Sequence, residues 1–246
     1  MPKKTNNKAC QLNVLAIGAH PDDIEILCAG TLARYAAQGH RIWMAVFTCG
    51  DMGDLQVPPP KLAAIRKAEA QASAALLGAE LLWIGVTDEC VFPNEAQRRL
   101  MIDLLRQADP DVIFTHGPND YHPDHRYVSQ LVFDSYFQKG LPHLPGQQQP
   151  ACRFGQAAVY YMDNLGGIEF LPTEYVDVSA VIETKCRMLA CHKSQVKAMA
   201  ELAHTDILDM VRVQGRFRGF AAGCAYAEGF RKLEAYQRGL TRRILP

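Results

Sequence analysis

The chain has 246 residues, 48% of them hydrophobic and 21% charged, an ordinary globular composition for one large α/β domain or at most two small ones. Lys and Arg together number 26, as do Asp and Glu, so the formal net charge is zero. This balance argues against non-specific nucleic-acid binding, which requires a basic surface. The sequence has no apolar run near the roughly 18–20 residues of a membrane-spanning helix, so no membrane partner is expected.

The N-terminal segment partly resembles a signal peptide, with a charged start followed by an apolar stretch. Lys3 and Lys4 precede an apolar stretch at 12–19. Polar residues separate the two, however, and the apolar stretch is short and leads straight into the charged segment 20–23. We therefore interpret residues 12–18 as a buried first strand.

Strand and helix patterns alternate over the first two-thirds of the chain. Short apolar runs, typical of parallel strands covered on both faces, predict strands at 12–18, 41–48, 80–84 and 111–115. Helical spacing predicts helices at 24–38, 61–77, 95–107 and 124–138. Gly39 and Gly78 follow the first two helices as natural stops. This alternation indicates right-handed βαβ units and a Rossmann-like, doubly wound, mainly parallel α/β sheet with helices on both faces.

The last third has a less regular pattern. Residues 140–153, rich in Pro, Gly and Gln, predict a surface insertion. After it we predict a strand at 157–162, an extended piece at 175–178, and helices at 180–202 and 217–230. Residues 1–11 and 235–246 are expected to be flexible tails. Because the sequence has no repeat or low-complexity block, residues 1–246 are predicted to form a single domain.

The eight cysteines are scattered and include no C-x-x-C pair. Several lie in apolar segments, where a free cysteine behaves as a small hydrophobic residue. This pattern favours a reduced, cytoplasmic protein over a disulfide framework.

Two clusters of His and Asp follow predicted strands. Segment 20–25 (HPDDIE) follows the first strand, and segment 122–125 (HPDH) lies in the loop after the fourth and opens a helix. In open α/β sheets, ligands bind beyond the carboxyl ends of the strands. A dinucleotide site would place G-x-G-x-x-G after the first strand, whereas here a nucleotide phosphate would meet negative charge. A hydride-transfer enzyme is therefore not expected.

Metal binding accounts for both clusters. His20 and Asp23 are three residues apart, so both can face one point from a tight turn, and His125 can supply a third ligand from the neighbouring strand end. Zinc bound by such a set keeps a water molecule and lowers its pKa to about 7. Fe2+ or another divalent ion accepts the same ligands. The alternative, that Asp22 or Asp23 merely caps a helix, does not account for two His-Pro-Asp clusters.

The neighbours of these ligands suggest further roles. Asp22 is placed to take a proton from the water, and His122 to face the developing oxyanion or protonate a leaving amine. Asp124 and Glu25 are candidates to hold the ligands in orientation. His116 ends the fourth predicted strand and is expected near the site. Four other histidines are predicted to be surface or structural residues: His40, His143, His192 and His204.

The two clusters resemble the motifs of zinc-dependent N-deacetylases of the LmbE/PIG-L type, with A-H-P-D-D-x-E after the first strand and H-P-D-H after the fourth. The likeness covers nearly the whole chain. Residues 66–78 resemble the family's R-x-x-E…L-G helix. Residues 192–195 (HKSQ) and 226–230 (YAEGF) resemble later segments of the bacillithiol-pathway branch. Residues 140–153 depart from the compact members in length.

The resemblance implies a ligand set and an activity. Zinc would bind His20, Asp23 and His125. Asp22 would be the general base, and His122 would stabilise the transition state or act as general acid. The substrate would be a small N-acetylated amino sugar, in which N-acetylglucosamine is attached to another group. The protein would be a homo-oligomer, a trimer or hexamer.

The resemblance also implies two substrate contacts. Arg66 would reach the substrate, although an ion pair with Glu69 or a surface position is an alternative. Tyr226 would donate to the oxyanion, although core packing on a helix is the simpler explanation. Two other hypotheses remain open. The first is an amidase that cleaves another linear amide or a thiol conjugate, and the second is a non-catalytic metal-binding member. The presence of Asp22 and His122 argues against the second.

Overall fold

The computed structural model describes residues 11–144 and 157–235. Seven strands of this described part form one sheet in the order β3-β2-β1-β4-β5-β7-β6. The first five in that order pair in parallel, whereas β7 runs antiparallel to both β5 and β6. The strands are β1 (Asn13–Gly18), β2 (Arg41–Thr48), β3 (Glu80–Val86), β4 (Val112–Thr115), β5 (Ala158–Met162), β6 (Glu174–Asp177) and β7 (Ala227–Lys232).

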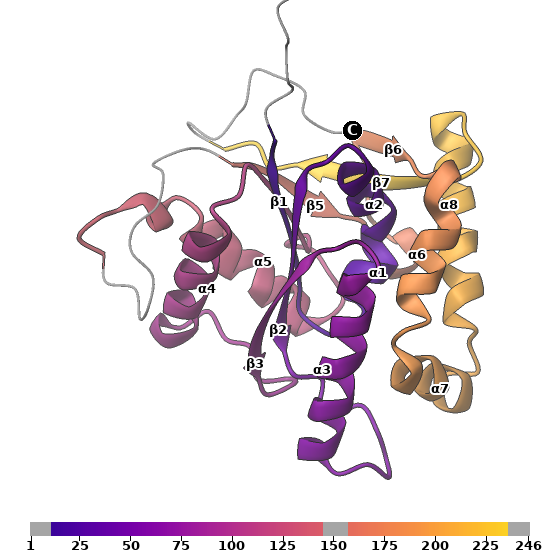
Figure 1. The fold of residues 1–246 in the computed structure, drawn as a ribbon, viewed down its shortest axis with the longest axis horizontal. Coiled ribbons are helices and arrows are strands. Elements are labelled where there is room, and N and C mark those ends of the chain that lie inside the picture. The colour runs from indigo at the N-terminus through magenta and orange to yellow at the C-terminus, as the bar shows by residue number, and fades with distance from the viewer. Residues whose placement is uncertain (1–10, 145–156, 236–246) are drawn as a thin grey trace, which may run out of the picture.

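Helices cover both faces of this sheet, as Figure 1 shows. On one face lie α4 (Glu95–Ala108) and α5 (Pro123–Ser135). On the other face lie α1 (Asp23–Leu27), α2 (Ala29–Ala37), α3 (Pro59–Ala75), α6 (Ile182–Leu189), α7 (Lys193–Leu202) and α8 (Ile207–Ala222). Short 3-10 turns are η1 (Gln138–Gly140), η2 (Leu165–Gly167) and η3 (Ser179–Val181).

The core has two halves because alternate side chains of a strand point to opposite faces of the sheet. Val14 and Ala16 of β1 belong to the cluster that includes residues of α2, α6 and α8. Leu15 and Ile17 belong to the cluster that includes residues of α4 and α5. The predicted single α/β domain with a mainly parallel, doubly wound sheet is thus confirmed.

The order of the strands reverses at β1. From β1 the chain moves outward to β2 and β3, and it then returns to place β4 on the other side of β1. The loops that follow β1 and β4 therefore leave the same edge of the sheet in different directions. Such a switch point is where open α/β sheets bind ligands.

Two of the predicted helices are divided in the structure. The helix expected at 24–38 is interrupted at Cys28, whose φ of −146° is not helical. The helix expected at 180–202 is interrupted at 190–192, and His192 turns into the interior, where its Nε2 lies 3.1 Å from Glu25 Oε1. The helical spacing of apolar residues continues across both breaks, so the pattern alone did not reveal them.

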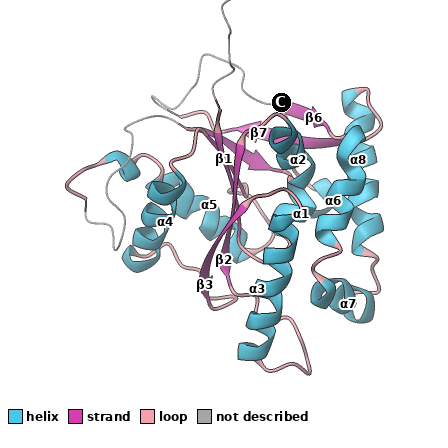
Figure 2. Ribbon diagram, viewed as in Figure 1, coloured by secondary structure: helices cyan, strands magenta, loops and turns pink. Residues whose placement is uncertain are grey.

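The prediction of a last helix at 217–230 is wrong. Helix α8 begins ten residues earlier, where the Asp206 side chain accepts hydrogen bonds from the Leu208 and Asp209 amides. It ends at Gly223, whose φ of 73° is the left-handed conformation typical of a helix stop. Residues 227–230 instead belong to strand β7, which Figure 2 shows beside β6. Glu228 and Phe230 are buried there by pairing that no local pattern indicates.

Three further observations concern the described residues. None of their helices combines the length and apolar character needed to cross a bilayer. Their six cysteines are all free thiols: Cys28, Cys49, Cys90, Cys186, Cys191 and Cys224. The predicted tails fall almost entirely outside the described part of the chain, as does most of the predicted insertion at 140–153.

Candidate active site

The two His-Pro-Asp clusters meet at the edge of the sheet where β1 and β4 end. Gly18 closes β1, and a Cβ at this position would lie 3.0 Å from the Cβ of Asp23. Only glycine therefore lets α1 start so close to the strand. Between the two, Asp22 has a φ of 118°, a conformation that non-glycine residues rarely adopt and that is concentrated at functional sites.

The three predicted ligands come together. His20 Nδ1 lies 3.2 Å from His125 Nε2 and 3.4 Å from Asp23 Oδ2, and His125 Nε2 lies 3.3 Å from Asp23 Oδ1. A tetrahedral zinc ion with bonds of about 2.0–2.2 Å holds its ligand atoms about 3.3–3.6 Å apart. The His20–His125 distance is close to this value, and the two Asp23 oxygens lie at 3.3–3.4 Å, one from each imidazole, so the three side chains can face one ion.

The second nitrogen of each imidazole faces a carboxylate. His20 Nε2 lies 3.1 Å from Asp88 Oδ1 and 3.4 Å from Asp124 Oδ2, and His125 Nδ1 lies 3.0 Å from Asp120 Oδ1. Partners of this kind orient metal-ligating histidines and fix their tautomers. The predicted neighbour Asp124 is thus beside His20, a predicted ligand, whereas Asp88 and Asp120 were not predicted.

The electrostatics of this cluster favour positive charge. Burial lowers the pKa of His20, but hydrogen bonds with Asp124, Asp23 and Asp88 outweigh it and raise the pKa to about 12. Burial likewise lowers the pKa of His125, which Asp23 and Asp120 nevertheless raise to about 9. A site with this preference for a cation, built from imidazole and carboxylate, suits a divalent metal ion.

His116 lies beside this ligand set and stacks on His125, with ring centroids 3.9 Å apart. Its Nε2 accepts a hydrogen bond from the Ala19 amide at 3.0 Å and is 3.2 Å from Asp23 Oδ2. Burial and the neighbouring His125 lower its pKa, which favours the neutral ring. Asp23, His116 and His125 form one possible metal-binding group, and His20, His122 and His125 form another. The lone pair of His116 Nε2 is occupied by the Ala19 amide. His20 is therefore a better candidate than His116 for the third ligand beside Asp23 and His125.

Asp22 is buried next to Arg66 rather than among the ligands. Its Oδ1 lies 3.5 Å from Arg66 Nη2, which also donates to the Pro21 carbonyl at 2.8 Å. Burial raises the pKa of Asp22, and the Arg66 charge opposes this, so that the pKa is about 6. Arg66 lines the cavity and does not pair with Glu69, which instead accepts hydrogen bonds from the Ser194 amide and hydroxyl.

His122 caps α5 and faces the cavity with one nitrogen. Its Nδ1 accepts a hydrogen bond from the Asp124 amide at 3.2 Å, which leaves the proton on Nε2, 3.1 Å from Glu89 Oε1. Burial and the nearby His20 and His125 lower the pKa of His122. A neutral ring with an Nε2–H donor toward the cavity follows from these contacts.

Two predicted residues lie away from the ligands. Glu25 is buried, accepts a hydrogen bond from Ser73 Oγ at 2.5 Å and faces His192. Tyr226 precedes β7, is half-buried against Gly215 of α8, and is not among the residues that line the cavity. Its position on a helix, expected from the sequence, is therefore wrong.

The structure adds site residues that the sequence did not single out. Asp88 and Glu89 follow β3, and Asp120 and Tyr121 follow β4, in loops at the carboxyl edge of the sheet. The rule that led to the first two clusters applies equally to these loops. Gln195 of α7 also lines the cavity; it lies in the segment 192–195 that resembles the family, but no role was predicted for it.

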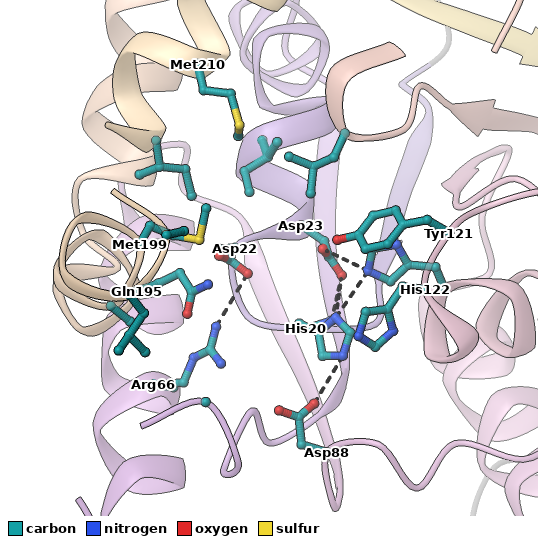
Figure 3. Close-up of a pocket in the computed structure, with 18 of the residues that line it drawn as sticks. His20, Asp22, Asp23, Arg66, Asp88, Tyr121, His122, Gln195, Met199 and Met210 are labelled. Atoms are coloured by element: carbon teal, nitrogen blue, oxygen red, sulfur yellow. Dashed lines mark hydrogen bonds and ion pairs between the residues drawn. The ribbon is translucent and has the colours of Figure 1, made fainter. Parts of the chain in front are cut away.

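These residues surround one cavity of about 290 Å³. Figure 3 shows Asp22, Asp23, His20 and His122 around its polar part, and Met199 and Met210 at the other end. The polar part combines a possible metal site, a carboxylate with a pKa near neutrality, a neutral imidazole donor and an arginine. This combination is suited to hydrolysis of an amide or ester.

A model of the family PIG-L, GlcNAc-PI de-N-acetylase, matches residues 15–136. A 1D-myo-inositol 2-acetamido-2-deoxy-alpha-D-glucopyranoside deacetylase from Catenulispora acidiphila is 31% identical, covering 83% of this chain and 82% of that protein. An N,N'-diacetylchitobiose deacetylase from Pyrococcus horikoshii has a TM-score of 0.76 at 27% identity, covering 89% of this chain and 83% of that one. A 4-carboxy-2-hydroxymuconate hydratase from Pseudomonas putida, at 21% identity, shares the fold with a TM-score of 0.75, covering 94% of this chain and 98% of that one. The chain belongs to the PIG-L family.

Proposed function

We propose that the protein is a metal-dependent N-deacetylase. It would hydrolyse the acetyl amide of a small molecule that contains N-acetylglucosamine and release acetate and a free amine. Deacetylases among the relatives support this class of reaction. The observation that carries the proposal is the convergence of His20, Asp23 and His125, each pair of which has one pair of atoms 3.2–3.4 Å apart, with Asp22 beside them in the same cavity.

We infer that zinc is the metal and that His20, Asp23 and His125 hold it. The two nitrogens and one carboxylate oxygen are a ligand set typical of catalytic zinc, although Fe2+ accepts similar ligands. When bound, zinc supplies a Lewis acid that polarises the acetyl carbonyl and makes a water molecule more acidic. Asp88, Asp124 and Asp120 keep the two imidazoles oriented toward it.

Asp22 would be the general base. A carboxylate with a pKa of about 6 is ionised at neutral pH and still basic enough to accept a proton from the attacking water. Arg66 and the strained backbone at Asp22 hold the carboxylate in one orientation. After the carbon–nitrogen bond breaks, the same carboxyl group can return its proton to the departing amine.

His122 would stabilise the negative charge that develops on the acetyl oxygen. Its Nε2–H faces the cavity, because Nδ1 accepts the Asp124 amide. A positioned donor of this kind is commonly worth about 3–4 kcal/mol in the transition state. Arg66 would contact the substrate from the other side of Asp22, whereas Tyr226 lacks a contact with the cavity that would support a similar role.

A hydratase has the same fold, so the fold alone does not determine the reaction. The test must therefore measure the products of the reaction. We would measure acetate and free amine from a panel of N-acetylglucosaminides with zinc-loaded protein, beside the variants Asp22→Asn and Asp209→Asn. Asp209 is an exposed carboxylate on α8 and serves as the matched control. We expect Asp22→Asn to slow turnover by about 10²–10⁴-fold with zinc still bound, and Asp209→Asn to behave as the parent.

Three results would contradict the proposal. If the parent binds zinc stoichiometrically but releases no acetate across the panel, the substrate is a different compound. Release of a larger acid, or of a thiol conjugate's acyl group, in place of acetate would indicate another amidase. Near-normal rates for Asp22→Asn would show that Asp22 is not the base. Homo-oligomer formation and a cytoplasmic location stay predictions.

A further inference from the structure

The cavity has an apolar wall opposite its polar part. Figure 3 shows Met199 and Met210 projecting toward Asp22 on the side away from Asp88. They belong to a set of six aliphatic or thioether side chains that line the cavity from α1, η2, α7 and α8: Ile26, Leu165, Met199, Leu202, Ile207 and Met210. Gln195 is the one hydrogen-bonding side chain that α7 and α8 contribute to the lining within the described residues.

A substrate made only of sugar fits this wall poorly. Sugar hydroxyls placed against aliphatic side chains lose their hydrogen bonds to water without gaining others, which is unfavourable. The acetyl group itself has only one methyl group to place against apolar side chains. Six apolar side chains therefore offer more apolar surface than an N-acetylated sugar can use.

The wall also reaches the surface. It runs from the buried Ile26 and Ile207 to Leu202, which is 56% exposed. Beyond Met210, the same side of α8 carries Val213, Phe217 and Phe220 at helical spacing, and Phe220 is 91% exposed. An extended apolar group that starts in the cavity can therefore reach the surface at Leu202, whereas the three α8 residues beyond Met210 do not line the cavity. Methionine side chains, two of which form the wall, adapt to apolar groups of different shapes.

Resting on the proposed deacetylase function, we propose that the group attached to the N-acetylglucosamine is apolar, such as an alkyl or aryl aglycone. The acetyl amide lies in the polar part, at Asp22 and the ligand residues. The aglycone lies against Met199, Ile207 and Met210 and extends toward Leu202. The wall is thereby the part of the site that selects the substrate.

The test compares two glycosides of equal chain length. One is hexyl N-acetylglucosaminide, and the other carries a 2-(2-hydroxyethoxy)ethyl group, in which one ether oxygen and one terminal hydroxyl oxygen replace two of the six carbons. We expect a higher kcat/KM for the hexyl compound by about tenfold or more, because each fully buried methylene is worth about fourfold. In Met210→Gln this ratio should fall toward one. Leu76→Gln, an exposed apolar residue at the end of α3, serves as the matched control and should keep the ratio.

Binding is measured separately, so that failure of the two proposals can be told apart. Calorimetry with zinc-loaded Asp22→Asn should show tighter binding of the hexyl compound whether or not the parent hydrolyses it. Preferential binding without acetate release from the parent would support the apolar subsite and contradict the proposed reaction. Equal binding and equal turnover of the two glycosides would overturn the apolar aglycone.

A third compound tests which end of the substrate meets the wall. Methyl N-hexanoylglucosaminide carries the same six carbons on the acyl side. We expect it to be the poorer substrate, since the acyl group is confined to the polar part. If it is hydrolysed faster than hexyl N-acetylglucosaminide, and Met210→Gln removes that advantage, the wall is an acyl pocket and the aglycone assignment is wrong.

Discussion

The two sides of the cavity are built in different ways. The polar side comes from loops at the carboxyl edge of the parallel sheet, and its side chains are buried and held by several partners each, as His20 is by Asp23, Asp88 and Asp124. The apolar side comes largely from α7 and α8, and none of the residues of α7 is buried. Groups that perform chemistry need fixed geometry, whereas a surface that selects among substrates can be more adaptable.

This comparison predicts that changes on the polar side affect turnover by orders of magnitude. Changes on the side formed by α7, α8 and the neighbouring loop should instead affect selectivity or stability.

Removal of the metal should have the largest effect. We expect a chelator to abolish turnover and added zinc to restore it. Zinc at about 1,000 times its Kd should also stabilise the protein by about 4 kcal/mol, seen as a higher Tm. Asp22→Asn should show the same shift in Tm, whereas Asp23→Ala should not, because Asp23 is one of the three proposed ligands. Full activity after chelation would contradict the metal site.

Removal of the imidazole at His122 should slow the reaction without preventing zinc binding. We expect His122→Ala to lower kcat by about 10²–10³-fold with little change in KM, because in the proposed reaction Nε2–H stabilises the transition state. His122→Gln keeps a donor and should recover part of the rate. If His122→Ala lost zinc instead, His122 would belong to the ligand set, as its grouping with His20 and His125 allows.

Among changes in α7 and α8, which form the apolar side of the cavity, the largest effect should be on the stability of the fold. Arg218 of α8 forms a buried ion pair with Asp163 at 2.6 Å and donates to the carbonyls of Gly167 and Phe170. Arg218→Met should lower the free energy of unfolding by about 3–5 kcal/mol, because Asp163 remains buried without its partner. Urea denaturation measures this.

The matched control for that variant is Arg216→Met, an exposed arginine on the same helix, which should change the free energy of unfolding by no more than about 0.5 kcal/mol. Zinc affinity should be the same in both variants and the parent. A large loss of zinc affinity in Arg218→Met would show that the two sides of the cavity are coupled, which contradicts their independence.

The smallest effect concerns pH. Burial raises the pKa of Glu25, but His192 and Ser73 lower it below 4.5, and burial lowers the pKa of His192, but Glu25 raises it above 6.5. Because the pKa of Glu25 is lower in the folded protein than in the unfolded chain, Glu25 stabilises the fold above pH 4.5. This stabilisation is lost as the pH falls through the pKa that Glu25 has in the folded protein. Because the pKa of His192 is higher in the folded protein than in the unfolded chain, His192 stabilises the fold below pH 6.5. This stabilisation is lost as the pH rises through the pKa that His192 has in the folded protein.

The coupling between Glu25 and His192 should therefore be greatest between pH 4.5 and 6.5. A double-mutant cycle with Glu25→Gln and His192→Gln, measured on metal-free protein, should give about 0.5–3 kcal/mol in this window. A coupling energy that did not change between pH 5.5 and pH 8.5 would contradict the ion pair.

The last third of the chain shows why part of the fold could not be predicted. The strand at 227–232 is short and carries the buried Glu228. Its carboxylate accepts hydrogen bonds from the Gly30 and Thr31 amides and forms an ion pair with Lys185. These partners are distant in the sequence. Without them a buried glutamate is unfavourable, and the segment's Ala and Glu favour a helix, as was predicted.

The site shows a similar division. The histidines and aspartates of the two clusters were recognisable from their types and spacing. Asp88 was not, because a single acidic residue in a loop is most often solvated. The contact of Arg66 with Asp22 rather than with Glu69 also depends on Ser194, which lies far along the chain and occupies Glu69.

By itself, the sequence determined the alternation of strands and helices up to residue 138 and the positions of the two His-Pro-Asp clusters at strand ends, because periodicity and motif spacing are local properties. Only the tertiary structure decided which side chains face each other: His20 with Asp88, Glu25 with His192, and the apolar residues of α7 and α8 with the cavity. Such pairings arise when folding buries groups from distant segments together, and each buried polar group must then find a partner.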